Sequence, residues 1–405
     1  EMCIRDRNGI EWLFAQAGSS LSEILPENRM ADLLINGILA GLSGILVFVP
    51  QIMILFGLIT LLEDTGYMAR ISFLSDKLMR KVGLNGKSVM PMISGFACAV
   101  PAIMSTRSIE NKKERLLTLL ITPLMSCSAR LPVFSILITL VIPADSWLGF
   151  FSLRGLVMMG LYVLGFLMAL AVSYVAKFWI KINEKSFFIL ELPSYRGPRW
   201  KNIALTMLNK ARIFVFDAGK IIMIISIALW ALSSFGPGDR MESIRADYGR
   251  RMALEPEKAG DLEHQKNAAL LEGSYAGIIG RTIEPVISPL GYDWKIGIAL
   301  ITSFAAREVF VGTMATLYSV QGGNDADANT LSEKMGRATY KDGRKVYTLA
   351  TGISLMIFYL FAMQCMSTLA VVKRETRSWK WPAIQFLYMT ALAYAGSLLA
   401  YQLLS

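Results

Sequence analysis

Three cysteines lie inside long apolar segments of the chain, Cys98, Cys127 and Cys365. Prolines close to the first two remove backbone N–H groups and clash with the preceding turn of a helix. Unwound backbone at membrane depth is tolerated only where it is buried in protein or lines a water-filled cavity. Thiols beside such breaks can offer a soft or borderline cation a place to shed its water. The pattern therefore indicates half-helices that face a path for a metal ion.

Apolar helices must position these thiols. The chain has 405 residues, of which 54% are hydrophobic and 18% charged, and its apolar runs are too long and numerous for a soluble core. We expect an all-α, polytopic helical membrane protein with about seven or eight transmembrane helices, some of them broken or re-entrant. The net charge of +10 comes from Lys and Arg gathered in loops between apolar runs, which is typical of cytoplasmic loops and not of nucleic-acid binding.

The chain divides by composition into four parts. Residues 1–8 lack an initiator Met and look like a sequencing artefact, so they and Cys3 are left out of functional arguments. The parts are an N-terminal remnant or linker (1–31), a first half of the transmembrane domain with a broken region (32–235), an extramembrane loop (236–295) and a second half with a second broken region (296–405). Within the loop, residues 275–290 are less polar and could re-enter the membrane.

Individual spans follow from the apolar runs. We expect them at 33–62, 89–104 (a half-span), 116–142, 155–180, 213–235, 296–320, 348–372 and 384–404, with an amphipathic interfacial segment at 63–88. The basic loop at 177–212 is expected in the cytoplasm, whereas the later loops do not resolve an orientation. A faint internal repeat relates the halves, because Arg107 follows Cys98 by nine residues and Arg374 follows Cys365 by nine.

Ionisable residues inside apolar spans are costly and usually face a bundle interior or water. Arg307 and Glu308 are such residues. Glu308 could attract a cation or accept a proton beside Arg307, or the two could be structural, although neighbouring helical residues point about 100° apart. Arg107 and Arg115 belong to a charged hinge, which is either solvated or a docking surface.

Other candidates have simple packing alternatives. Arg130 could lower the pKa of a nearby thiol. Met92, Met104 and Met125 could be thioether ligands, but the chain has 22 Met and most must be packing residues. An isolated buried cysteine is also commonly a small apolar packing residue, so only the set of thiols at breaks favours a ligand role.

Several motifs occur in one order that resembles a known family. They are GYMAR (66–70), GKSVMPMISGFACAVPAI (86–103), PLMSCSARLPVF (123–134), ELPSYRGPRW (191–200), AAREVFVGTMATLY (305–318) and MQCMSTLAVVKRET (363–376). Together they resemble the membrane domain of the ferrous iron transport protein B (FeoB) family, with its paired Gate regions. The resemblance covers the chain from about residue 30 to its end.

The resemblance implies a bacterial inner-membrane, multi-pass importer of Fe(II), and not an enzyme in this part. The family's Gate and late-helix cysteines fall on Cys98, Cys127 and Cys365, whereas Ala97 and Ala99 stand where many relatives have Gly and Asn. The family also implies an amino-terminal GTPase domain, which this sequence does not include, and which would bind GTP and magnesium. Expected partners are the lipid bilayer, the ferrous ion, that GTPase domain, small cytosolic Feo-type accessory proteins and a second copy in a homo-oligomer. We expect no tightly bound cofactor and no nucleic acid.

Three alternative functions can be compared with the residues that each would need. Gly86-Lys87-Ser88 is only a near-miss to a phosphate-binding loop, because Lys81 stands where that loop needs a glycine. A Gate-type carrier of another solute, such as a nucleoside, would better suit uncharged polar residues at the breaks. An intramembrane thiol or redox protein would need a Cys-x-x-Cys pair or a nearby base, which the apolar segments lack.

Overall fold

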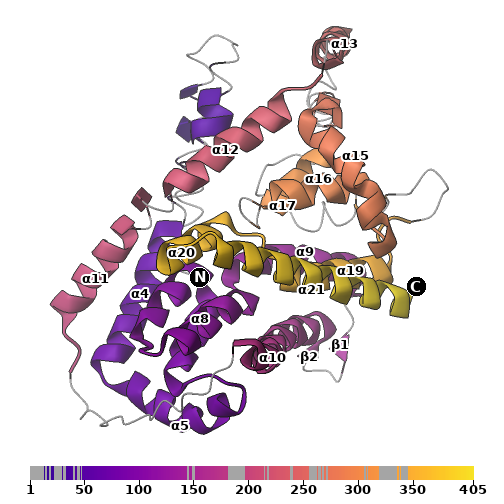
Figure 1. The fold of residues 1–405 in the computed structure, drawn as a ribbon. Helices are drawn as coiled ribbons and strands as arrows, with labels where there is room; N and C mark the ends of the chain where they lie inside the picture. The colour runs from indigo at the N-terminus through magenta and orange to yellow at the C-terminus, as the bar shows by residue number, and fades with distance from the viewer. Residues whose placement is uncertain are drawn as a thin grey trace. The chain divides into compact units, whose positions relative to one another are not determined.

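The computed structural model describes most of the chain from Phe48 onwards (Figure 1). The continuous ranges are 48–143, 151–180, 197–213, 219–237, 240–254, 272–304, 309–318 and 345–405, with residues 33–39, 146–147 and single positions such as Arg307 beside them. This part is predominantly helical, which confirms the all-α prediction. Its one short strand pair joins β1 (Ser146–Trp147) to β2 (Phe151–Ser152).

The chain forms two compact units. The first comprises residues 1–128, 163–227 and 366–386, and the second comprises 129–162, 228–365 and 387–405. The chain passes between the units five times, and three of these passages lie inside the helices α10 (Leu153–Ile180), α12 (Gly219–Ser234) and α21 (Lys380–Leu404).

The first unit contains the helices α4 (Phe48–Asp64), α5 (Tyr67–Lys81), α6 (Val89–Ala97), α7 (Ala99–Ser105), α8 (Lys112–Ile121), α11 (Trp200–Ile213) and α20 (Met366–Thr376). Helix α11 packs against α4, and α20 packs against α7. One apolar core joins α4, α7, α8 and α20 through Phe56, Val100, Ile103, Met104, Leu119, Val371 and Val372. Residues far apart in the sequence therefore form the unit together.

The second unit contains α9 (Leu131–Val141), α13 (Arg240–Leu254), α15 (Tyr275–Ile287), α16 (Trp294–Thr302), α17 (Val309–Leu317) and α19 (Leu349–Phe361). Helix α15 packs on α16, and α9 packs on α19. A Cβ atom at Gly352 would overlap the side chain of Val141, so a glycine is required where α19 meets α9. The less polar stretch 275–290 forms α15 and the turn after it, while its re-entry into a membrane stays a prediction.

Four segments of the described chain are long and apolar enough to cross a membrane, namely Lys112–Val141, Leu153–Phe178, Leu349–Thr376 and Lys380–Leu404. They agree with a helical membrane protein, and the count of seven or eight crossings stays a prediction. The expected span at 348–372 is interrupted at residues 362–365, where α19 ends before α20 begins. The expected span at 296–320 likewise contains two helices, α16 and α17.

The amphipathic segment predicted at 63–88 forms α5. Its apolar residues Phe73, Leu74 and Leu78 are exposed, whereas Met79 is buried. An exposed apolar row beside basic residues is typical of a helix that lies along a membrane interface, and that location stays a prediction.

Candidate functional site

A break between α6 and α7 lies at Cys98, whose backbone is extended with φ −158° and ψ 135°. The cause is Pro101, which has no N–H to donate to the carbonyl of Ala97 four residues earlier. The chain resumes its helix at Ala99, so Pro101 stands in the first turn of α7, where a missing N–H leaves no helical bond unmade. The predicted break is confirmed, and it falls just before the proline that causes it.

A second break lies at residues 125–127, between the short helical turns Thr122–Leu124 and Ser128–Arg130. A residue next to this break bonds the carbonyl that Pro101 leaves free. Ser128 donates a hydrogen bond of 2.9 Å from its Oγ to the carbonyl oxygen of Ala97. A Cβ atom at Gly95 would lie 3.1 Å from Cβ of Met125, so α6 also approaches the second break closely. Because Cys98 follows Ala97 and Cys127 precedes Ser128, the structure brings the two cysteine-bearing breaks together within the first unit.

At the end of α8, a side chain again replaces the backbone donor that a proline lacks. Pro123 cannot donate to the carbonyl of Leu119, and Gln385 takes the place of that donor. Its Nε2 donates to the carbonyls of Leu119 and Leu120 over 3.3 and 3.0 Å, and the side chain is completely buried. Sequence reasoning missed Gln385, although an amide in an apolar span is the expected signal for a bond between helices.

Arg307 stabilises a third break, in the second unit. Helix α19 ends at Phe361, and the next helix begins at Met366, directly after Cys365. The guanidinium of Arg307 donates to the carbonyls of Ala362 and Gln364 over 3.2 and 3.4 Å, and the residue is 5% exposed. A cation at a helix C-terminus also complements the helix dipole. These bonds support a structural role for Arg307, while Glu308 lies outside the described residues and both interpretations of it stay open.

The three cysteines divide between the units, with Cys98 and Cys127 in the first and Cys365 at the end of a segment of the second. All three are half-buried, and none of these described cysteines forms a disulfide. Cys98 packs on the edge of the apolar core that α7 and α20 share. Within the described part of the chain, no three His, Cys, Asp or Glu side chains gather as a metal site. A joint path past the three thiols therefore stays a prediction.

The remaining candidates are buried side chains. Met92 and Met125 are 1% exposed, Met104 is 7% exposed and Arg130 is completely buried. Such burial suits packing by methionine, and a ligand role for either Met92 or Met125 stays a prediction. The effect of Arg130 on a thiol stays a prediction as well.

In the turn at residues 86–88, which resembles a phosphate-binding loop, the backbone N–H groups already donate hydrogen bonds within the protein. The N–H of Gly86 donates to Oδ1 of Asp76 over 2.9 Å, and the N–H of Lys87 donates to Oδ1 of Asn85 over 3.3 Å. The N–H of Ser88 donates to the carbonyl of Asn85. A phosphate would have to compete with a carboxylate for this turn, which is unfavourable.

Comparison with known proteins identifies the family. Residues 45–142 and 215–379 match the Gate model, described as nucleoside recognition, and residues 158–210 match the model described as ferrous iron transport protein B C terminus. The chain belongs to the FeoB family. Both cysteine-bearing breaks of the first unit and the break before Cys365 lie in the Gate match of this FeoB chain. No solved structure gave a significant match.

Relatives named Fe(2+) transporter FeoB are similar over nearly the whole chain. One from Leptospira interrogans is 43% identical over 393 residues, which are 97% of this chain and 54% of the relative. One from Leptospira biflexa is 41% identical over 95% of this chain and 52% of the relative. A Fe(2+) transport protein A/FeoB fusion from Porphyromonas gingivalis is 36% identical over 98% of this chain and 46% of the relative. The chain spans about half the length of these curated relatives.

Proposed function

We propose that this FeoB-family chain forms the membrane path of a ferrous iron transporter, in which Fe(II) passes Cys98, Cys127 and Cys365. The observation that carries the proposal is the hydrogen bond from Ser128 to the carbonyl of Ala97, which holds two thiol-bearing breaks together. Fe(II) is borderline in softness, so thiol sulfur and the carbonyl oxygens of unwound backbone can replace part of its water shell. Fe(II) is the cargo of this path, and the chain needs no tightly bound cofactor for it.

The longer protein is proposed to be a multi-pass protein of the bacterial inner membrane. Its relatives are about twice as long as the matched region, which leaves room for the GTPase domain that gates transport in this proposal. The fusion relative from Porphyromonas gingivalis supports a small accessory protein as a partner. Glu308 is proposed to attract the cation, and normal uptake by Glu308→Gln would overturn that role.

The test is uptake of Fe(II) into vesicles that contain the full-length reading frame. Cys98→Ser, Cys127→Ser and Cys365→Ser should each lose most of the uptake, because a hydroxyl is a poor substitute for a sulfur ligand. Ser135→Ala is the control and should transport normally, because the exposed Ser135 hydroxyl donates to the carbonyl of Leu131 in its own helix. Full uptake by all three membrane variants would reject the thiol path.

The description of the Gate model supports a second candidate, a carrier of a nucleoside. The same vesicles should be given Fe(II), Mn(II), Zn(II) and a nucleoside in separate experiments. Uptake of the nucleoside without uptake of a metal would favour the second candidate over the first. Uptake of Fe(II) that excess nucleoside does not reduce would exclude it.

A further inference from the structure

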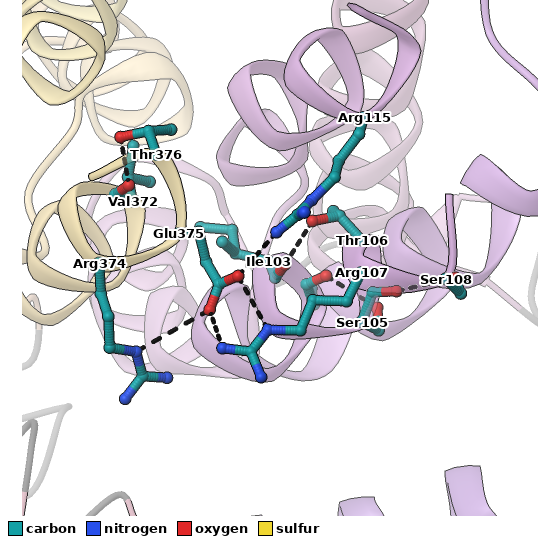
Figure 2. A network of polar contacts seen from close by, with 11 residues as sticks. Ile103, Ser105, Thr106, Arg107, Ser108, Arg115, Val372, Arg374, Glu375 and Thr376 are labelled. Carbon is teal, nitrogen blue, oxygen red and sulfur yellow. Dashed lines mark hydrogen bonds and ion pairs between the residues drawn. The ribbon is translucent and has the colours of Figure 1, made fainter. Parts of the chain in front are cut away.

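A buried carboxylate joins two distant parts of the first unit. The side chain of Glu375, in the last turn of α20, is only 2% exposed. Arg107 donates to its two oxygens from Nε and Nη2 over 2.9 and 2.6 Å, and Arg115 donates from Nη2 over 2.8 Å (Figure 2). The Nε of Arg374 lies 3.8 Å from the same carboxylate. Three guanidinium groups therefore surround one acid.

The geometry makes this contact stronger than an ordinary surface ion pair. Arg107 binds the carboxylate with two donors, and bidentate charge-assisted hydrogen bonds are the strong class of such bonds. The hydrogen bond to Glu375 raises the pKa of Arg107, although partial burial of the guanidinium acts in the opposite direction. Removing Arg107 would take two charged donors from the buried carboxylate of Glu375, which is costly because that carboxylate is only 2% exposed.

The contact connects two helices that each begin one residue after a cysteine. Arg107 lies in the turn after α7, which begins directly after Cys98, and Glu375 ends α20, which begins directly after Cys365. Helices α7 and α20 pack against each other within the shared core. The faint sequence repeat acquires a physical meaning here, since its two arginines, Arg107 and Arg374, both lie beside Glu375.

We propose that Glu375 is a positioning residue of the ion path, because it ties the turn after α7 to the end of α20 and so fixes the two helices that begin directly after Cys98 and Cys365. The contact itself is independent of what is transported. Its importance for transport rests on the proposed function. A side chain that only stabilised its own helix would not transmit a change across the 268 residues that separate Arg107 from Glu375.

Hydrogen–deuterium exchange of the detergent-solubilised protein tests the tie without any ion. Glu375→Gln should raise exchange at residues 106–111, and Arg107→Gln should raise it at 372–379, each by about tenfold or more, as expected for lost charged hydrogen bonds. The control is Glu110→Gln, which removes a carboxylate bonded to Lys87 over 2.9 Å but 89% exposed. It should leave residues 372–379 unchanged. Increases confined to the segment that carries each substitution would overturn the proposal.

If Glu375→Gln fails to fold, the exchange of Arg107→Gln still tests the tie. Glu375 keeps its bond to Arg115 in that variant, so its carboxylate is not left without a charged partner. In addition, the Arg107→Gln/Glu375→Gln double variant should be less affected than the sum of the single variants. An additive result would mean that the two residues act separately and would refute the tie.

Uptake of Fe(II) by the same variants tests the second half of the proposal. Glu375→Gln and Arg107→Gln should reduce uptake severalfold more than Glu110→Gln does. Normal uptake with raised exchange would overturn the positioning role while the transport function stands. Absence of uptake by the unsubstituted protein would refute the proposed function, whereas the exchange experiment would still report on the tie.

Discussion

The Oγ of Ser128 donates a 2.9 Å hydrogen bond to the carbonyl oxygen of Ala97, which Pro101 deprives of its helical donor. One small side chain thus joins two breaks that lie 31 residues apart in the sequence. The same principle recurs where Gln385 bonds the end of α8 and where Arg307 bonds the end of α19. At each of these breaks a side chain from elsewhere in the sequence donates to at least one backbone carbonyl.

Substitution of Ser128 tests the first of these bonds. Ser128→Ala should lower the free energy of unfolding by about 1–3 kcal/mol, because it leaves a carbonyl without its donor. Ser135→Ala is the matched control, since the exposed Ser135 hydroxyl bonds only to Leu131 in its own helix. Unfolding in detergent should show a change below about 0.5 kcal/mol for that control. Equal losses in both variants would contradict this role for Ser128.

Gln385 should be more sensitive than its position in a long apolar helix suggests. Gln385→Ala removes the donor to both Leu119 and Leu120, with an expected loss of about 2 kcal/mol of stability. Thermal unfolding of the purified protein is the measurement. The exposed Gln402 near the end of α21 provides the control, and Gln402→Ala should have almost no effect. The idea fails if the two alanine variants unfold alike.

Arg307→Lys keeps the charge but loses the planar fork of donors that reaches two carbonyls. We expect a loss of about 1–3 kcal/mol of stability together with reduced Fe(II) uptake. Arg250→Lys, at an exposed position of α13, should leave both properties unchanged. Normal stability and uptake in Arg307→Lys would show that any cation at this position is sufficient.

Substitution of a glycine by alanine should have opposite effects on stability at a close helix contact and at an open position. Gly352→Ala should lower stability by about 1–3 kcal/mol, because the new methyl group overlaps Val141. Gly160→Ala in α10 meets no atom within 4 Å, so it should raise stability by about 0.5–1 kcal/mol through better helix propensity. Unfolding of the two variants side by side is the test, and a tolerated Gly352→Ala would show that α19 and α9 can separate.

Local chemistry in the sequence predicted part of this structure well. Apolar content predicted the helical membrane class, and the prolines around Cys98 predicted a broken helix there. The exact place of the break follows from the preference of proline for a first turn, which puts the interruption three residues before Pro101. The interruption before Cys365 has no proline in it, so no comparable local signal predicts it.

Long-range partners could not be predicted in this way. The sequence predicts that the charged hinge at Arg107 and Arg115 is solvated or a docking surface, but it does not predict that both arginines bind Glu375. Nothing in the local pattern tells a hinge arginine that faces water from one whose partner is 268 residues away. Ser128 was missed for a similar reason, because its bond depends on how the two breaks pack.

The first unit includes residues 366–386, so its fold closes around a segment that leaves the ribosome long after the rest of that unit. A helix as short as α7 is not stable alone, and its apolar partners in α20 are synthesised more than two hundred residues later. Nascent chains must therefore keep the segment around Cys98 without its packing partners until α20 has been synthesised. Biogenesis of this protein should consequently depend on insertion factors that shield such incomplete segments.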